Sequence, residues 1–93
     1  MASPRQAGRT SEQMRSAPRG ATYVWVNDEL TYPRDLARFL RRTDLRIVSP
    51  LALTDGRLLG LHVDQLVVDH AAKLNLRPEE AAALRHLTAR RAP

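Results

Sequence analysis

The chain has 93 residues, a length that suits one domain, and it contains no cysteine, which excludes disulfides and thiolate metal sites. No run of about twenty apolar residues is present, so we expect no membrane association and a cytoplasmic location. The net charge is +5, and all but one of the 15 basic residues are arginine. Because abundant Arg and Ala are typical of a GC-rich coding sequence, the arginine excess alone does not indicate phosphate binding.

Residues 1–20 have almost no apolar side chains to bury and are rich in Ser, Pro, Gly and Arg. This composition predicts a disordered basic N-terminal tail, followed by a single small domain over residues 21–93. The tail is either an arm that contacts nucleic acid or an unselected leader, with Met14 as an alternative first residue. Its basic residues are Arg5, Arg9, Arg15 and Arg19.

Three short apolar runs predict strands, at residues 21–26, 45–49 and 65–69. Their consecutive apolar and β-branched residues are typical of strands buried on both faces, as in a parallel sheet, and Trp25 is expected in the core. The first two runs are joined by a short helical connection, which favours a right-handed crossover between adjacent parallel strands. The expected fold is α/β: a minimal three-stranded parallel sheet of order 2-1-3, with the element order β-α-β-loop-β-α and two main helices.

The first helix is expected to begin at Thr31, as its cap, and to pack Leu36, Phe39 and Leu40 on the sheet. Its other side carries a basic stripe, which is either a solvated face or a contact surface for nucleic acid. The stripe consists of Arg34, Arg38, Arg41 and Arg42.

The second helix is expected over residues 78–91, because it starts with proline and two glutamates and ends in arginines. Residues 67–87 also allow a helix-turn-helix interpretation, in which one helix runs from Leu59 to Leu74 and a recognition helix starts at Pro78. Two carboxylates at the start of a recognition helix would meet phosphates, which counts against this alternative.

Polar residues follow each predicted strand, namely Asn27, Asp28, Glu29, Ser49, Asp69 and His70. Because the carboxyl ends of parallel strands meet at one edge of a sheet, we expect these residues to share a rim. Such a cluster suits a divalent cation held by oxygen ligands, or a His–Asp pair for proton transfer. Alternatively, these residues cap helices and form turns.

The segment 57–72, with its apolar run ending in Asp69-His70, resembles the acidic-strand region of phage terminases and related helicase-like ATPases. It is also similar to small proteins of actinobacterial phages. The resemblance implies that Asp69 matches the magnesium-holding acid, whereas His70 replaces the glutamate that orients water. No phosphate-binding loop of the form G-x-x-x-x-G-K-[ST] is present, so we expect no nucleotide hydrolysis and no cofactor.

Three strands and two helices leave sheet faces and edges uncovered, which favours an interaction protein over an enzyme. We therefore expect a non-enzymatic protein from a phage or mobile element that binds a protein or nucleic-acid partner and self-associates. Nucleic acid would contact the basic tail and the helix over residues 34–42. The alternatives are the helix-turn-helix regulator and a metal- or nucleotide-dependent site at the rim.

Overall fold

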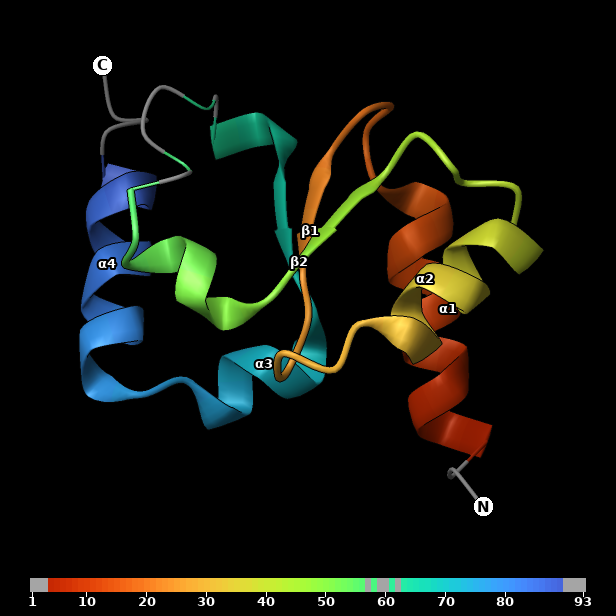
Figure 1. Cartoon of the computed structure of the whole chain (residues 1–93), viewed down its shortest axis with the longest axis horizontal. Coiled ribbons are helices and arrows are strands. Elements are labelled where there is room, and N and C mark those ends of the chain that lie inside the picture. Colours follow the sequence, from red (N-terminus) through yellow and green to blue (C-terminus); the bar gives the residue numbers. More distant parts are fainter. Residues whose placement is uncertain (1–3, 57, 59–60, 62, 90–93) are drawn as a thin grey trace.

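Three parallel strands form the centre of the structure, which is a computed structural model that describes residues 4–56, 58, 61 and 63–89. The strands are β1 (Thr22–Val24), β2 (Arg46–Val48) and β3 (Leu66–Val68), and they lie in the order β2-β1-β3 (Figure 1). The predicted α/β class and the 2-1-3 strand order are confirmed. Each strand is shorter than its apolar run, although Trp25 and Asp69 beyond the strand ends still donate their N–H groups to the neighbouring strands.

The strand register places apolar side chains on both faces of the sheet, since successive residues of a strand point to opposite sides. The two aligned rows are Tyr23, Ile47 and Val67 on one face, and Val24, Val48 and Val68 on the other. Each row belongs to a separate hydrophobic cluster. This two-sided burial is the physical reason why the runs do not alternate with polar residues.

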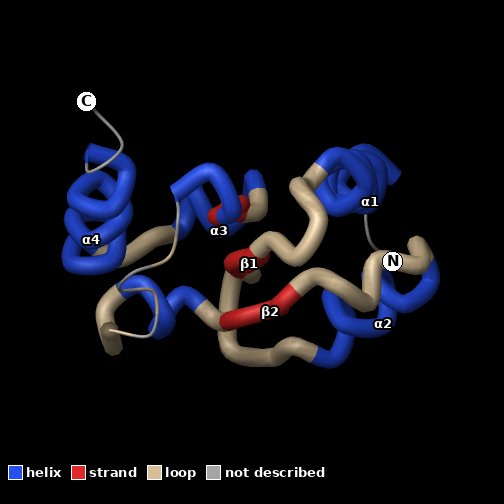
Figure 2. Tube along the Cα trace, turned by 90° about the horizontal axis from the view of Figure 1, so that it is seen from above, coloured by secondary structure: helices blue, strands red, loops and turns tan. Residues whose placement is uncertain are grey.

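Helices α1 (Pro4–Ser16) and α2 (Thr31–Phe39) cover the Tyr23 face of the sheet (Figure 2). The prediction of a disordered tail is wrong for residues 4–16, which form a helix with a fully buried Met14. The Met14 side chain supplies an apolar contact with the core that the composition of residues 1–20 does not indicate. Polar bonds add to it: Thr10 donates to Asp69, and Gln13 donates to the Val68 carbonyl.

Helix α2 buries Pro33 and Ala37 on the side that faces the hydrophobic cluster around Tyr23, with Leu36 and Leu40 partly buried beside them. Phe39 is 80% exposed, so the prediction that it packs on the sheet is wrong. Phe39 follows Ala37 by two residues, which is about 200° around the helix axis, and it therefore points away from the sheet. The N-cap is Leu30 and not Thr31, which is the first helical residue.

The opposite face of the sheet is covered by the 3₁₀ helix η1 (Pro50–Leu53) and by the helices α3 (His70–Asn75) and α4 (Pro78–Ala89). A second short 3₁₀ helix, η2 (Val63–Gln65), leads into β3. Helix α4 packs on η1 at the side of the molecule away from α1 and α2 (Figure 1). The predicted second helix is confirmed to residue 89, and residues 90 and 91 lie outside the described part.

The helix-turn-helix interpretation needs one helix over residues 59–74, of which 59, 60 and 62 are not described. Strand β3 occupies the middle of that range, so the prediction of this helix is wrong. The reason is that Val67 and Val68 pair with the central strand and bury one side chain on each face. The remaining helix, α3, has only six residues.

Candidate functional site

The six polar residues that were expected to share one rim are divided among three places. Asn27, Asp28 and Ser49 line one cleft together. Asp69 is buried under α1, and His70 lies beside Gln13 of that helix. Glu29 is exposed, and its carboxylate accepts the Thr31 N–H at the start of α2. The hydrogen bond from the Thr31 side chain, followed by that from its N–H, lowers the pKa of Glu29. The rim is thus polar as expected, but it does not form one cluster.

The Asp69 carboxylate has no exposed surface and accepts three hydrogen bonds. Oδ1 accepts from the Tyr23 hydroxyl and from Thr10 Oγ1 at 3.1 Å, and Oδ2 accepts the Ala71 N–H at 3.0 Å as the cap of α3. Burial, together with the neighbouring carboxylate, raises the pKa of Tyr23 above its ordinary range. The magnesium-holding role that the terminase resemblance implies does not fit this residue, because neither oxygen reaches solvent.

The His70 ring also interacts with other side chains of the protein. Its Nδ1 lies 3.2 Å from Gln13 Oε1, which also accepts the His70 N–H, and 3.7 Å from Asp69 Oδ2. The second distance is too long for a hydrogen bond, so the expected His–Asp proton-transfer pair is not formed. Among the residues that the structure describes, no group of three or more His, Asp or Glu side chains is placed to hold a metal ion.

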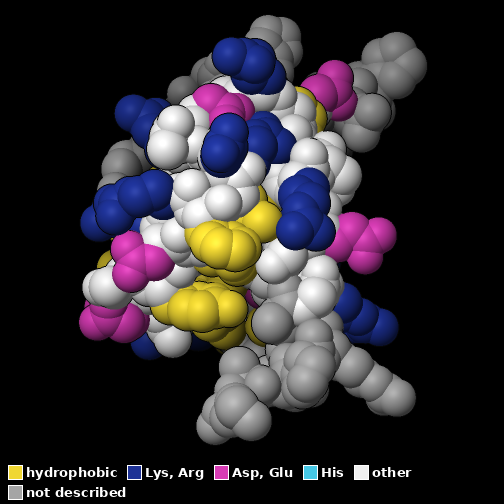
Figure 3. Space-filling view, turned by 90° about the vertical axis from the view of Figure 1, so that its right-hand side faces the viewer, with side chains coloured by type: hydrophobic (Ala, Val, Ile, Leu, Met, Phe, Trp, Pro, Cys, Tyr) yellow, Lys and Arg dark blue, Asp and Glu magenta, His cyan; other side chains and the backbone are white. Residues whose placement is uncertain are grey.

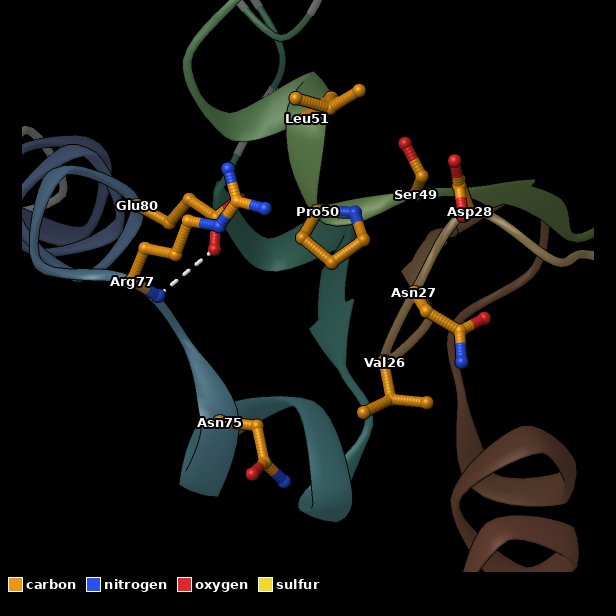
Figure 4. Close-up of a pocket in the computed structure, with 9 residues that line it drawn as sticks. All are labelled: Val26, Asn27, Asp28, Ser49, Pro50, Leu51, Asn75, Arg77 and Glu80. Atoms are coloured by element: carbon orange, nitrogen blue, oxygen red, sulfur yellow. Dashed lines mark hydrogen bonds between the residues drawn. The ribbon is translucent and has the colours of Figure 1, made fainter.

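Asn27, Asp28 and Ser49 line a cleft of about 450 Å³, which we call the rim cleft (Figure 4). Arg77 and Glu80 form one wall, Asn27 and Asp28 the opposite wall, and Pro50 lies between them. The lining residues are Val26, Asn27, Asp28, Ser49, Pro50, Leu51, Asn75, Arg77 and Glu80.

The wall formed by α3 and α4 was not predicted from the sequence. Glu80 Oε1 accepts the Arg77 N–H at 2.9 Å, which is half of a capping box at the start of α4. The Pro-Glu-Glu pattern after Arg77 indicates this helix start. It does not indicate that the short helix α3 returns the chain to the rim.

Arg42 differs from the other basic residues proposed to bind nucleic acid. Its guanidinium donates to the carbonyl oxygens of Met14 at 2.6 Å, Arg15 at 3.1 Å and Pro18 at 3.2 Å, and it forms an ion pair with Asp44 at 2.9 Å. The Met14 and Arg15 carbonyls belong to the last turn of α1, where backbone acceptors lack partners within the helix, and the Pro18 carbonyl lies in the turn that follows. Arg42 is therefore a structural residue, and it is not available to bind phosphate.

The Arg42–Asp44 pair is completed by a backbone contact. Asp44 Oδ2 also accepts the Gly20 N–H at 2.8 Å, in the turn between α1 and β1. The hydrogen bond from Arg42, followed by that from Gly20, holds the pKa of Asp44 well below its usual range. Gly20 has a φ of +76°, a conformation that favours glycine.

The other candidate arginines are on the surface. Arg5 lies in α1, although its side chain is outside the described part. The exposed side chains are Arg9, Arg15, Arg19, Arg34, Arg38 and Arg41.

Three of these arginines, Arg34, Arg38 and Arg41, lie on α2 or just after its end, and α2 also carries two exposed aromatic rings. Tyr32 is 48% exposed and Phe39 is 80% exposed, and because they are seven residues apart they lie on the same side of the helix. The Tyr32 ring lies 5.8 Å from the Trp25 ring, which is partly buried on the core. The α2 face is defined here as Tyr32, Arg34, Arg38, Phe39 and Arg41.

Figure 3 shows the side of the molecule that α1 and α2 form, with hydrophobic side chains at its centre and both basic and acidic side chains around them. Arg38 is 3.7 Å from Asp35 in an exposed pair, which stabilises the helix only slightly. Arg34 and Arg41 have no ion pair within the part of the chain described by the structure. The α2 face therefore combines exposed aromatic surface with positive charge that is mostly uncompensated.

A scan against protein-family models matches no family to this chain, and searches of curated proteins and of solved structures return no match. In the described residues, no helix is both long and apolar enough to cross a membrane. The function is accordingly inferred from the residues themselves.

Proposed function

We propose that the chain is a small non-enzymatic interaction protein that binds single-stranded nucleic acid on the α2 face. The observation that carries this proposal is the 80% exposure of Phe39 on the same element as Arg34 and close in the chain to Arg41, neither of which has an ion pair among the described residues. Exposed aromatic rings are stacking platforms for bases, each worth about 1–3 kcal/mol, and nearby arginines attract the phosphate backbone.

The spacing of the basic side chains supports a strand that follows the helix. Arg34 and Arg38 are four residues apart, which separates them by about 6 Å along the axis of α2 on one side. Tyr32 and Phe39 are separated by about 10 Å along the same axis. Arg34 and Arg38 lie about 130° around the helix axis from Tyr32 and Phe39, so a strand that follows α2 must also cross its exposed side to meet both the rings and the cations.

A single strand is favoured over a duplex because only a single strand presents the faces of its bases. The structure offers no long recognition helix among its described elements: α3 has six residues, and α4 begins with Pro78, Glu79 and Glu80. We therefore expect contacts by stacking and charge, with little sequence preference.

Fluorescence anisotropy with a labelled oligothymidylate and a labelled duplex of equal length tests this proposal. The single strand is expected to bind more tightly than the duplex, and its affinity is expected to fall steeply as salt is raised. Equal affinity for both, or no binding of either at low salt, would contradict the proposal.

A protein partner is the second candidate, and the chemistry of the same face favours it. Tyr, Phe and Arg are enriched in the energetically dominant centres of protein interfaces. Charge complementarity requires an acidic partner, since two copies of this face repel each other. Sedimentation velocity over a range of protein concentrations tests the self-association expected from the sequence. The charge argument predicts that any dimer forms through another surface, and a dimer that Phe39→Ala abolishes would contradict it. The cytoplasmic location and the phage or mobile-element origin stay predictions.

A further inference from the structure

The two aromatic rings of the α2 face are held differently. The Tyr32 ring is tilted by 40° against the Trp25 ring, with 5.8 Å between the ring centroids, and Tyr32 is still 48% exposed. Phe39 is 80% exposed, and it has no aromatic partner within the part of the chain that the structure describes. A tilted ring pair at this separation is a favourable contact, so Trp25 restricts the orientation of Tyr32.

Trp25 is itself fixed by the sheet. Its N–H donates to the Val48 carbonyl at 2.8 Å, which continues the pairing of β1 with β2 beyond the end of β1. Because Trp25 follows Tyr23 by two residues, its side chain lies on the same face of the sheet, where it packs on the hydrophobic cluster around Tyr23. The Tyr32 ring therefore lies against a side chain that the core holds in place.

The charges at the two ends of α2 differ. Asp28 and Glu29 precede the helix, whereas Arg38 lies in its last turn. Arg34 is close to Tyr32 in the chain, but it is about 160° away from it around the helix axis. Carboxylates near the start of α2 repel a phosphate, while the face of a base is uncharged and stacks on a ring. The Tyr32 end of the α2 face therefore suits a base better than a phosphate.

We propose that Trp25 is a positioning residue for nucleic-acid binding, because it holds the Tyr32 ring in the orientation on which a base of the single strand stacks. The inference rests on the proposed function of the α2 face and adds a partly buried residue outside that face. Ordering a free side chain on binding lowers the affinity, and a ring that is already held avoids part of this loss.

A double-mutant cycle tests this role, with the binding of labelled oligothymidylate followed by fluorescence anisotropy. Tyr32→Ala is expected to weaken binding by at least about fivefold, as the loss of one stacking ring does. Trp25→Leu is expected to weaken it about two- to tenfold, and Trp25→Phe, which keeps a ring beside Tyr32, is expected to restore most of the affinity. In the Tyr32→Ala background, Trp25→Leu should have no further effect, because the ring that it positions is absent.

Phe39→Ala supplies the matched background for the cycle. Trp25→Leu is expected to weaken binding there by the same factor as in the wild type, since Phe39 does not depend on Trp25. A general disturbance of the fold by Trp25→Leu would weaken binding in both backgrounds, so the cycle separates positioning from folding. Far-UV circular dichroism and a thermal melt verify that each variant is folded.

The positioning role is overturned if Trp25→Leu binds like the wild type, if it weakens binding equally with and without the Tyr32 ring, or if Trp25→Phe binds as weakly as Trp25→Leu. Each of these results is obtained with a wild type that binds the single strand, so the proposed function would stand. A wild type that does not bind the single strand would contradict both the function and the role of Trp25.

Discussion

The Arg42 guanidinium donates a hydrogen bond of 2.6 Å to the backbone carbonyl oxygen of Met14. This contact joins the turn after α2 to the last turn of α1, and it gives a second donor to a carbonyl that also accepts the Ala17 N–H at 3.4 Å. The buried Met14 side chain and this bond together hold α1 on the sheet.

Replacing Arg42 is therefore expected to destabilise the protein. Arg42→Gln should lower the free energy of unfolding by about 1.5–3 kcal/mol, because hydrogen bonds from a charged group to three carbonyls and a carboxylate are lost. Arg34→Gln, on the exposed side of α2, should change it by less than about 0.5 kcal/mol. Urea unfolding measures both, and equal stability of the two variants would refute the structural role of Arg42.

A second prediction concerns the backbone conformation of Arg41. Arg41 has a φ of +60°, its N–H donates to the Arg38 carbonyl, and the Arg42 N–H donates to the Ala37 carbonyl, so α2 ends in a Schellman motif. Glycine adopts this conformation without strain, so Arg41→Gly should stabilise the protein by about 1 kcal/mol. Arg38→Gly, one turn earlier within the helix, should destabilise it by about 1 kcal/mol. A thermal melt of each variant shows whether the two effects have opposite signs.

The stability of the fold at acid pH depends on Asp44. Because its pKa is lowered in the folded protein, its contribution is fully present above the pKa of an unfolded aspartate, about 3.9, and it is lost as the pH falls toward the folded value. Asp44→Asn is expected to be less stable than the wild type at neutral pH and to show a smaller loss of stability below about pH 4. Urea unfolding at a series of pH values measures the difference, and parallel curves for the two proteins would exclude this role.

The stability at alkaline pH depends on Tyr23. Its hydroxyl donates to the buried Asp69 carboxylate, and its raised pKa means that folding favours the neutral phenol. Its contribution is therefore fully present below the unfolded value of about 10 and is lost as the pH rises above it. Tyr23→Phe should cost about 1–3 kcal/mol at neutral pH, because Asp69 loses a donor, and it should remove this part of the alkaline loss. Unfolding curves of both proteins between neutral and strongly alkaline pH measure this difference. An equal loss of stability at alkaline pH in the wild type and in Tyr23→Phe would contradict the proposed contribution of Tyr23.

The sheet was predictable because burial on both faces leaves a strong sequence signal. The three apolar runs locate the strands, and the short connection through Pro33 and Leu36 makes β1 and β2 adjacent and parallel. Helix α1 was not predictable from composition, since one buried methionine and bonds from Thr10 and Gln13 to a distant strand hold it in place.

The candidate site was predictable only in part. Asn27, Asp28 and Ser49 follow adjacent strands and do meet, as the parallel topology requires. The Asp69 carboxylate lies under α1, where it accepts hydrogen bonds from Tyr23 and Thr10. These partners are distant in the sequence, so no local pattern indicates the position of Asp69. Arg77 reaches the cleft because α3 is only six residues long, a length that tertiary packing determines.

The measurement that tests the proposed function most directly compares single-strand binding by two truncated surface side chains. Phe39 on the α2 face and Leu74 on α3 are 80% and 83% exposed, so Phe39→Ala and Leu74→Ala remove similarly exposed apolar groups from different elements. We predict that Phe39→Ala weakens oligothymidylate binding by about 1–3 kcal/mol at constant salt, while Leu74→Ala binds like the wild type. Equal affinities of the two variants would contradict the assignment of nucleic-acid binding to the α2 face.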